Sequence, residues 1–289
     1  MLDLGAMRVR LRSRVAGLAA ALAQVYRHFP LDDADPYVDS ELRLDRGRDW
    51  PRIWQARLRF LADGTAPFES APAALSLAQL EWGMNWVYAH LFSRHLLLHS
   101  GAVERHGVGL MLVASPGSGK STLTAALSLR GFRVLSDEFG SLRLSDRRLL
   151  PLAKPVALKN TSIDLIRAWS PDAVLGPVFV GTHKGDVAHL ALTQDSVSRR
   201  HEPARPGILI FPTWQADQPV ELTRVMPARA LSELAHNSFN YSLLGQPAFE
   251  AASDLVAGCE CYRLTYGRLP EVVPVLEDLC RARSQRALV

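Results

Sequence analysis

The residues best suited to chemistry lie in a short loop rich in glycine and serine. Residues 114–122 read Ala-Ser-Pro-Gly-Ser-Gly-Lys-Ser-Thr, which matches the phosphate-binding Walker A pattern except that Ala114 replaces its first glycine. Glycines allow successive backbone N–H groups to converge on phosphate oxygens, and the lysine adds a positive charge. We therefore predict a nucleotide-binding set made of Ser115, Pro116, Gly117, Ser118, Gly119, Lys120, Ser121 and Thr122.

The flanking residues support this interpretation. Residues 110–113 form an apolar strand, and Leu123 and Leu127 repeat on one face of the helix expected after the loop. A helix that begins at Ser121 directs its positive end toward a bound anion. The alternative is a glycine-rich turn that binds no nucleotide.

Two acids follow the next short strand, at 132–135, and form the second chemical group. Asp137 and Glu138 come directly after it, and carboxylates near a phosphate loop hold Mg²⁺ or take a proton from an attacking hydroxyl. We predict a magnesium site made of Ser121, Asp137 and Glu138. The alternative is that the two acids are ordinary exposed loop carboxylates.

Three basic positions are candidates with less support. His99 stands in an apolar strand, where a lone histidine is more often a core residue than a catalytic one. Lys184 lies in the turn-prone stretch 182–185, where it is suited to offset charge developing on a γ-phosphate; the alternative is a solvated loop lysine. Lys154 and Lys159 are weaker candidates, and one of them could line the same site.

The elements that must position these residues predict an α/β fold in two parts. Residues 1–74 form a small α+β accessory unit: a strand with alternating arginines, a helix over about 13–29 capped by Ser13, two strands at 37–44 and 57–61, and a linker at 65–74. The core, residues 75–289, begins with a helix over 77–95 whose Ser76 and Gln79 have capping-box spacing. Strands 96–103 and 107–113 are too close for a parallel crossover, so the sheet is mixed.

Composition excludes several classes of protein. Hydrophobic residues make up 48% and charged residues 21% of the 289 residues, as in ordinary globular enzymes. The net charge of +4 is mild and scattered, so we expect no nucleic-acid partner. No apolar run approaches the roughly 18 residues that span a bilayer, and three cysteines form no disulfide framework. We expect a cytoplasmic protein without a membrane partner, and the sequence leaves self-association open.

Three segments together resemble HPr kinase/phosphorylase, whose catalytic domain shares a phosphate-loop fold with phosphoenolpyruvate carboxykinase. They are His99-Ser100-Gly101-Ala102, the loop at 114–122 and Ser136-Asp137-Glu138. A resemblance to the bacterial group called HPr kinase-related kinase A extends over about residues 1–280. It is carried by the stretches 80–86 (LEWGMNW), 154–160 (KPVALKN), 184–190 (KGDVAHL) and 237–241 (NSFNY).

These resemblances imply an ATP- and Mg²⁺-dependent kinase that phosphorylates a hydroxyl, with the serine of a protein or peptide as the acceptor. His99 would belong to the active site and Asp137 would be the general base, whereas Glu138 replaces a second aspartate of the family. Some related kinases act on lasso-peptide precursors, and others accompany small PqqD-like peptide-binding proteins. The catalytic set is thus His99, Asp137, Lys120 and Lys184. Two other classes stay open: an ATPase or nucleotide switch, and a nucleotide-binding partner in a peptide-maturation complex.

Overall fold

The main sheet is mixed, as the sequence predicts. The computed structural model describes residues 1–30, 37–47, 56–115 and 117–286. Its eight-stranded sheet has the order β10-β9-β6-β7-β14-β16-β15, with β8 also paired to β6. Strands β7, β14 and β16 are parallel, whereas β6 runs antiparallel to β7 and β15 antiparallel to β16. The strands are β6 Leu96–Arg105, β7 Val108–Val113, β8 Arg133–Ser136, β9 Phe139–Leu142, β10 Leu149–Leu150, β14 Pro206–Trp214, β15 Glu221–Arg224 and β16 Glu260–Tyr266.

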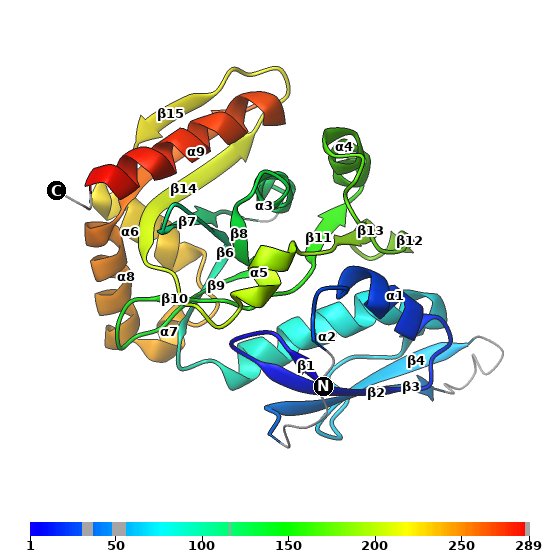
Figure 1. The fold of residues 1–289 in the computed structure, drawn as a ribbon. Helices are drawn as coiled ribbons and strands as arrows, with labels where there is room; N and C mark the ends of the chain where they lie inside the picture. The colour runs from blue at the N-terminus through cyan, green and yellow to red at the C-terminus, as the bar shows by residue number, and fades with distance from the viewer. Residues whose placement is uncertain (31–36, 48–55, 116, 287–289) are drawn as a thin grey trace.

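Helices cover both faces of this sheet (Figure 1). Along β7, Leu110 and Leu112 belong to the core cluster that contains α3 (Lys120–Ser128) and α9 (Leu269–Arg286). Met111 and Val113 instead join the cluster of α6 (Pro227–His236) and α8 (Gln246–Gly258). A strand that is buried on both faces has a continuous run of apolar residues. This explains why β7 contains no charged or polar side chain. The short helices α5 (Gln194–Ser198) and α7 (Tyr241–Leu244) complete this part of the chain.

A second, three-stranded sheet lies beside the main one. Its order is β11-β13-β12, all antiparallel, with β11 at Val156–Lys159, β12 at Phe179–Thr182 and β13 at Gly185–Leu190. Helix α4 (Thr161–Trp169) follows β11. Contacts between β11 and α3 join this sheet to the helix that follows the glycine-rich loop.

The amino-terminal residues form a five-stranded sheet of β1 (Leu2–Asp3), β2 (Arg8–Ser13), β3 (Ser40–Gly47), β4 (Arg57–Ala62) and β5 (Ala71–Pro72). Helix α1 (Leu18–Val25) and the long helix α2 (Ser76–Leu91) pack with it. Gly83 allows the closest approach, since a Cβ there would lie 2.2 Å from an atom of the Phe60 ring. Helix α2 shares one hydrophobic core with this sheet. The expected division of the chain into two parts at residue 74 stays a prediction.

Two expected helix caps are wrong. Ser13 ends β2 and its Oγ donates to the Leu44 carbonyl at 3.0 Å, so α1 begins only at Leu18, after Gly17 with a positive φ of 80°. Ser76 is already the first residue of α2, which continues the 3₁₀ turn η1 (Ala73–Leu75) without a side-chain cap. The Ser13 side chain is thus engaged by a neighbouring strand, and the Ser76 side chain is buried within the helix, so neither caps a helix.

Other boundaries shift by a few residues. Strand β3 spans 40–47 rather than 37–44, and α2 ends at Leu91 rather than at 95. The expected linker 65–74 holds β5 and η1. The segment 31–36, between the expected helix at 13–29 and the expected strand at 37–44, lies outside the described residues.

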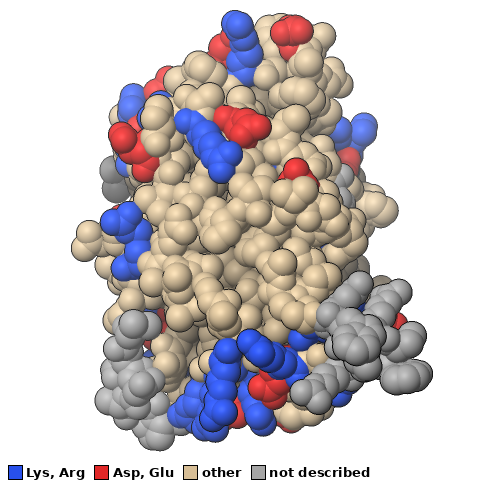
Figure 2. All heavy atoms as spheres, turned by 90° about the vertical axis from the view of Figure 1, so that its right-hand side faces the viewer, with Lys and Arg blue, Asp and Glu red and all other residues tan. Residues whose placement is uncertain are grey.

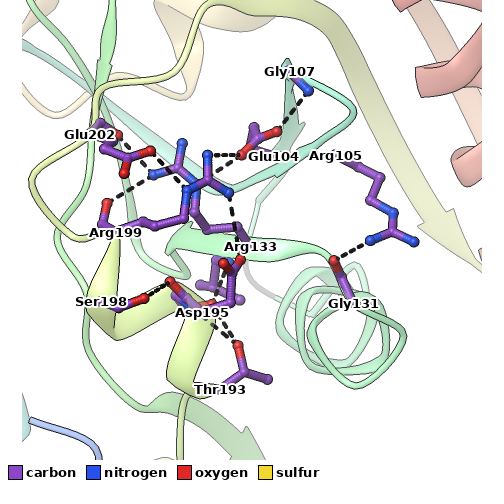
Figure 3. A network of polar contacts seen from close by, with 12 residues as sticks. Glu104, Arg105, Gly107, Gly131, Arg133, Thr193, Asp195, Ser198, Arg199 and Glu202 are labelled. Carbon is purple, nitrogen blue, oxygen red and sulfur yellow. Dashed lines mark hydrogen bonds and ion pairs between the residues drawn. The ribbon is translucent and has the colours of Figure 1, made fainter.

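A buried ion network anchors β8 beside β6 (Figure 3). Glu104 of β6 accepts from Arg133 Nε of β8 at 2.8 Å and pairs with Arg199 at 3.1 Å. Arg133 also donates to the carbonyls of Arg199 and Glu202. Because the Arg133–Glu104 pair is almost fully buried, loss of one partner would leave an uncompensated charge. The network therefore fixes the strand that leads into Asp137.

Charged side chains are unevenly distributed over one face of the molecule. Figure 2 shows few of them in the middle of that face and a group of basic side chains at its lower end, where the five-stranded sheet lies in Figure 1. The residues of that sheet include arginines but no lysine. Arg12 and Arg43 of that sheet pair with Glu41 and Asp45, so the local excess is partly neutralised. Within the described residues, no helix combines the length and apolar character required to cross a membrane.

Candidate active site

The glycine-rich loop lies between β7 and α3, as predicted, and two neighbouring strands hold it. The Trp214 N–H donates to the Ser118 carbonyl at 3.2 Å, and Tyr266 Oη donates to the Gly119 carbonyl at 3.3 Å. Gly119 has a φ of 86°, and a Cβ there would lie 2.7 Å from Tyr266 Oη. Glycine is thus required at 119 for both its backbone conformation and its packing. Pro116 lies outside the described residues.

Polar atoms around this loop are buried without a partner. Within the described part of the chain, Lys120 Nζ and Ser118 Oγ have no hydrogen-bond partner. Burial lowers the pKa of Lys120, while the charges of Asp137 and Glu138 oppose that shift. A buried ammonium without hydrogen bonds is costly, and a helix N-terminus attracts anions. The loop therefore fits the phosphate groups of a nucleotide.

Gly101 explains how β6 and α3 come close enough to form a site. A Cβ at Gly101 would lie 2.4 Å from Thr124 Oγ1 and 3.6 Å from Lys120 Cγ. Since alternate residues of a strand share a face, His99 lies on the same side of β6, toward α3. The spacing of His99 and Gly101 thus places an imidazole beside the start of the loop helix.

His99 is uncharged at neutral pH. Burial and the charge of Lys120 lower its pKa to about 4, although Glu138 and a hydrogen bond to the Ala114 backbone act in the opposite direction. Its Nε2 lies 3.7 Å from Glu138 Oε1. This contact is consequently a polar contact of a neutral ring, not a charged pair.

The two acids occupy a break in a strand. Both β8 and β9 pair with β6, Ser136 opposite Ala102 and Phe139 opposite His99. Asp137 and Glu138 fall between them, and Ser136 Oγ shapes the break by accepting from the Phe139 N–H at 3.1 Å. Sequence analysis correctly places the acids after a strand, but the second half of that interrupted edge is visible only in the structure.

Asp137 and Glu138 have different environments. Asp137 is buried, and its Oδ1 has no partner among the described residues. Burial raises its pKa to about 6, with Glu138 adding to the shift and with Lys120 and a hydrogen bond to Ser121 opposing it. Glu138 is half-buried; burial would raise its pKa, but the charges of Lys120, Lys184 and Lys159 lower it overall. The two carboxylates are thus suited to different roles.

The donor set fits magnesium better than metals that are held mainly by protein. Among the described residues there is no group of three or more His, Cys, Asp or Glu side chains arranged to hold a metal. Mg²⁺ commonly takes one or two carboxylates and completes its shell with phosphate oxygens and water. Ser121 and Glu138 fit that role, and Asp137, which is hydrogen-bonded to Ser121, lies beside them.

Lys184 and Lys159 are two further cations that act electrostatically on Glu138. Lys184 Nζ lies 5.4 Å from the ring centroid of Trp82, which also contacts His183 edge-to-face. Partial burial and the charge of Lys159 lower the pKa of Lys184, while Glu138 opposes the shift. Lys159 also acts electrostatically on His99, Lys120 and both acids. It belongs to the site, although sequence analysis ranked it no higher than Lys154.

Lys154 has a structural role. It is buried, pairs with Glu81 at 3.0 Å, and donates to Asn85 Oδ1 at 2.6 Å. Tyr26 Oη donates to the same Glu81. A small cavity of about 30 Å³ separates this group from the two acids, with Glu81, Lys154, Asp137, Glu138 and His189 among its lining residues. Helix α2 therefore lines the cavity next to the acids. Its residues Glu81, Trp82 and Asn85, from the 80–86 stretch, are the ones that line it.

The structure thus brings together the described loop residues, Lys120, His99, Asp137 and Glu138, with Lys184 at the edge of the group. Comparison of the chain with known protein families and with curated proteins finds no match. The functional argument consequently depends on the geometry of these residues.

Proposed function

We propose that this chain is an ATP- and Mg²⁺-dependent kinase that transfers the γ-phosphoryl group to a serine hydroxyl of a protein or peptide. The observation that carries the proposal is the pair of unpartnered buried groups, the Lys120 ammonium and Asp137 Oδ1. Each acts electrostatically on the other. A cation for phosphate and a base for a hydroxyl are the two groups that phosphoryl transfer requires.

We also propose that the main sheet is a phosphate-loop kinase core of the HPr kinase and phosphoenolpyruvate carboxykinase type. Its support is the position of His99 on β6, antiparallel to the loop strand β7. The two acids in the break between β8 and β9 add to that support.

Each residue then has a defined task. The loop amides and Lys120 would hold the β- and γ-phosphates. Ser121 and Glu138 would hold Mg²⁺, which when bound would neutralise charge on the phosphates. Asp137, ionised above its pKa of about 6, takes the proton from the serine hydroxyl. The hydroxyl oxygen forms a bond to the γ-phosphorus as the bond to the β-phosphate oxygen breaks, and ADP leaves. Lys159 and Lys184 offset negative charge at the γ-phosphate.

The experiment is transfer from ATP labelled at the γ-phosphate to serine-containing peptides, with Mg²⁺ present. The proposal expects phosphoserine in the parent protein and none in Lys120→Ala. Steady release of phosphate without any labelled acceptor would instead support an ATPase or nucleotide switch.

A further inference from the structure

The segment 237–239 forms a short extension of the main sheet at the candidate active site. Strand β7 pairs with β6 only from Ser100 onward. Before that point, the His99 N–H donates to the Asn237 carbonyl at 2.6 Å and the Phe239 N–H donates to the Leu97 carbonyl at 2.9 Å. The segment therefore lies beside His99 and takes the place that β7 leaves free.

Two buried asparagines fix this segment on either side of Phe239. Asn240 accepts from the Leu97 N–H at 3.0 Å and donates to the carbonyls of Ser93 and His95. Asn237 donates to the Glu233 carbonyl at 2.9 Å and accepts from Ser115 Oγ of the glycine-rich loop at 3.4 Å. The backbone between them is held in place, so little conformational entropy is lost when a ligand contacts its side chain.

Phe239 is the exposed side chain of this fixed segment. Its ring lies 5.6 Å from the His99 ring, edge-to-face, and 5.0 Å from the Phe139 ring, yet 51% of the residue is exposed. A partly exposed aromatic ring on a fixed backbone is typical of a binding contact. Its contact with His99 places it at the entrance of the transfer site.

The charges nearby favour an uncharged neighbour for the acceptor serine. The site contains Lys120, Lys159 and Lys184 against Asp137 and Glu138. In the proposed site these cations would neutralise charge on the nucleotide phosphates, and the acids would serve the metal and the acceptor hydroxyl. Phe239 adds an apolar ring in contact with His99.

We propose that Phe239 binds an apolar side chain next to the acceptor serine and so selects the polypeptide that is phosphorylated. This inference rests on the proposed kinase function and names the substrate class of the same site: a peptide segment with an aliphatic or aromatic residue adjoining the serine. Stacking or packing on the ring places the hydroxyl beside His99 and Asp137.

The test uses synthetic peptides Gly-Ala-X-Ser-X-Ala-Gly in which X is Leu, Phe, Ala, Asp or Lys. In the parent protein, kcat/KM for X = Leu or Phe should exceed that for X = Ala by about tenfold or more, the range that one apolar contact provides. In Phe239→Ala this ratio should fall to about one. Phe249→Ala is the matched control, because Phe249 is 52% exposed on α8, and it should keep the parent ratio.

A second variant separates selectivity from folding. Phe239→Lys should shift the preference toward X = Asp, a gain that a misfolded protein cannot show. Parent protein that phosphorylates all peptides equally, or Phe239→Ala that keeps the apolar preference, would overturn this inference alone. Transfer to none of the peptides by the parent would overturn the proposed function and this inference with it.

Discussion

His99 Nε2 lies 3.7 Å from Glu138 Oε1 although His99 is in β6 and Glu138 is in the break between β8 and β9. One strand, β6, thereby positions both halves of the candidate site. It pairs with both pieces of the interrupted edge, and its Gly101 allows α3 to approach.

Substitution of Asp137 should separate catalysis from stability. Its pKa of about 6 in the folded chain is above its ordinary value of 3.8, so folding favours the protonated form. Its ionisation therefore costs stability as pH rises from about 4 to 6 and above, on the order of 3 kcal/mol at neutral pH. Asp137→Asn should raise the free energy of unfolding at pH 7 in the absence of nucleotide, measured by denaturant titration. The difference from the parent should shrink toward pH 4.

The same variant should lose transfer. Removal of a general base typically costs about 10²–10⁴ in rate. In the parent protein kcat/KM, which reports the free enzyme, should rise between pH 5 and 7 as Asp137 ionises. A flat pH profile over that interval, or full activity in Asp137→Asn, would contradict the base assignment.

Gly101→Ala should damage the proposed nucleotide site where β6 packs against α3. The new Cβ would lie 2.4 Å from Thr124 Oγ1, and overpacking of this kind typically costs about 1–3 kcal/mol. We expect a lower melting temperature and weaker binding of Mg·ATP in calorimetry.

Two controls test the cause of that loss. Gly258→Ala, where nothing lies within 4 Å of the new Cβ, should change neither property. The double variant Gly101→Ala/Thr124→Ala should recover much of the loss; no recovery would show that the Thr124 contact is not its cause.

Lys154 and Lys159 should differ in what their substitution affects. Lys154→Met breaks a buried pair with Glu81, and removal of one buried partner typically costs about 3–5 kcal/mol. Lys159 is exposed, so Lys159→Met should leave the free energy of unfolding nearly unchanged and lower kcat instead. Chemical denaturation and transfer rates measured on the two variants provide the comparison, and equal effects on both quantities would contradict it.

The sequence predicts the parts of the site that depend on local spacing. The loop at 114–122, the mixed sheet and the acids at 137–138 follow from short-range patterns, because a phosphate loop requires a fixed order of strand, turn and helix. What the sequence misses or leaves open depends on partners that are distant in the chain. Ser13 bonds Leu44 instead of capping a helix. Lys154 and Lys159 are equal candidates in the sequence, but Lys154 pairs with Glu81 whereas Lys159 acts electrostatically on both acids.

Phe239 illustrates the same limit. Its stretch of polar and aromatic residues is visible in the sequence, but its place beside His99 depends on pairing between segments separated by about 140 residues. Spacing along the chain contains no information on that pairing.

The central claim is that the glycine-rich loop and Lys120 bind the phosphates of a nucleotide, and calorimetric titration with Mg²⁺ and a non-hydrolysable ATP analogue tests it most directly. We predict one binding site per chain in the parent protein and no measurable heat in a folded Lys120→Ala variant. A folded parent protein that gives no binding heat, or a Lys120→Ala variant that binds as tightly as the parent, would contradict the account.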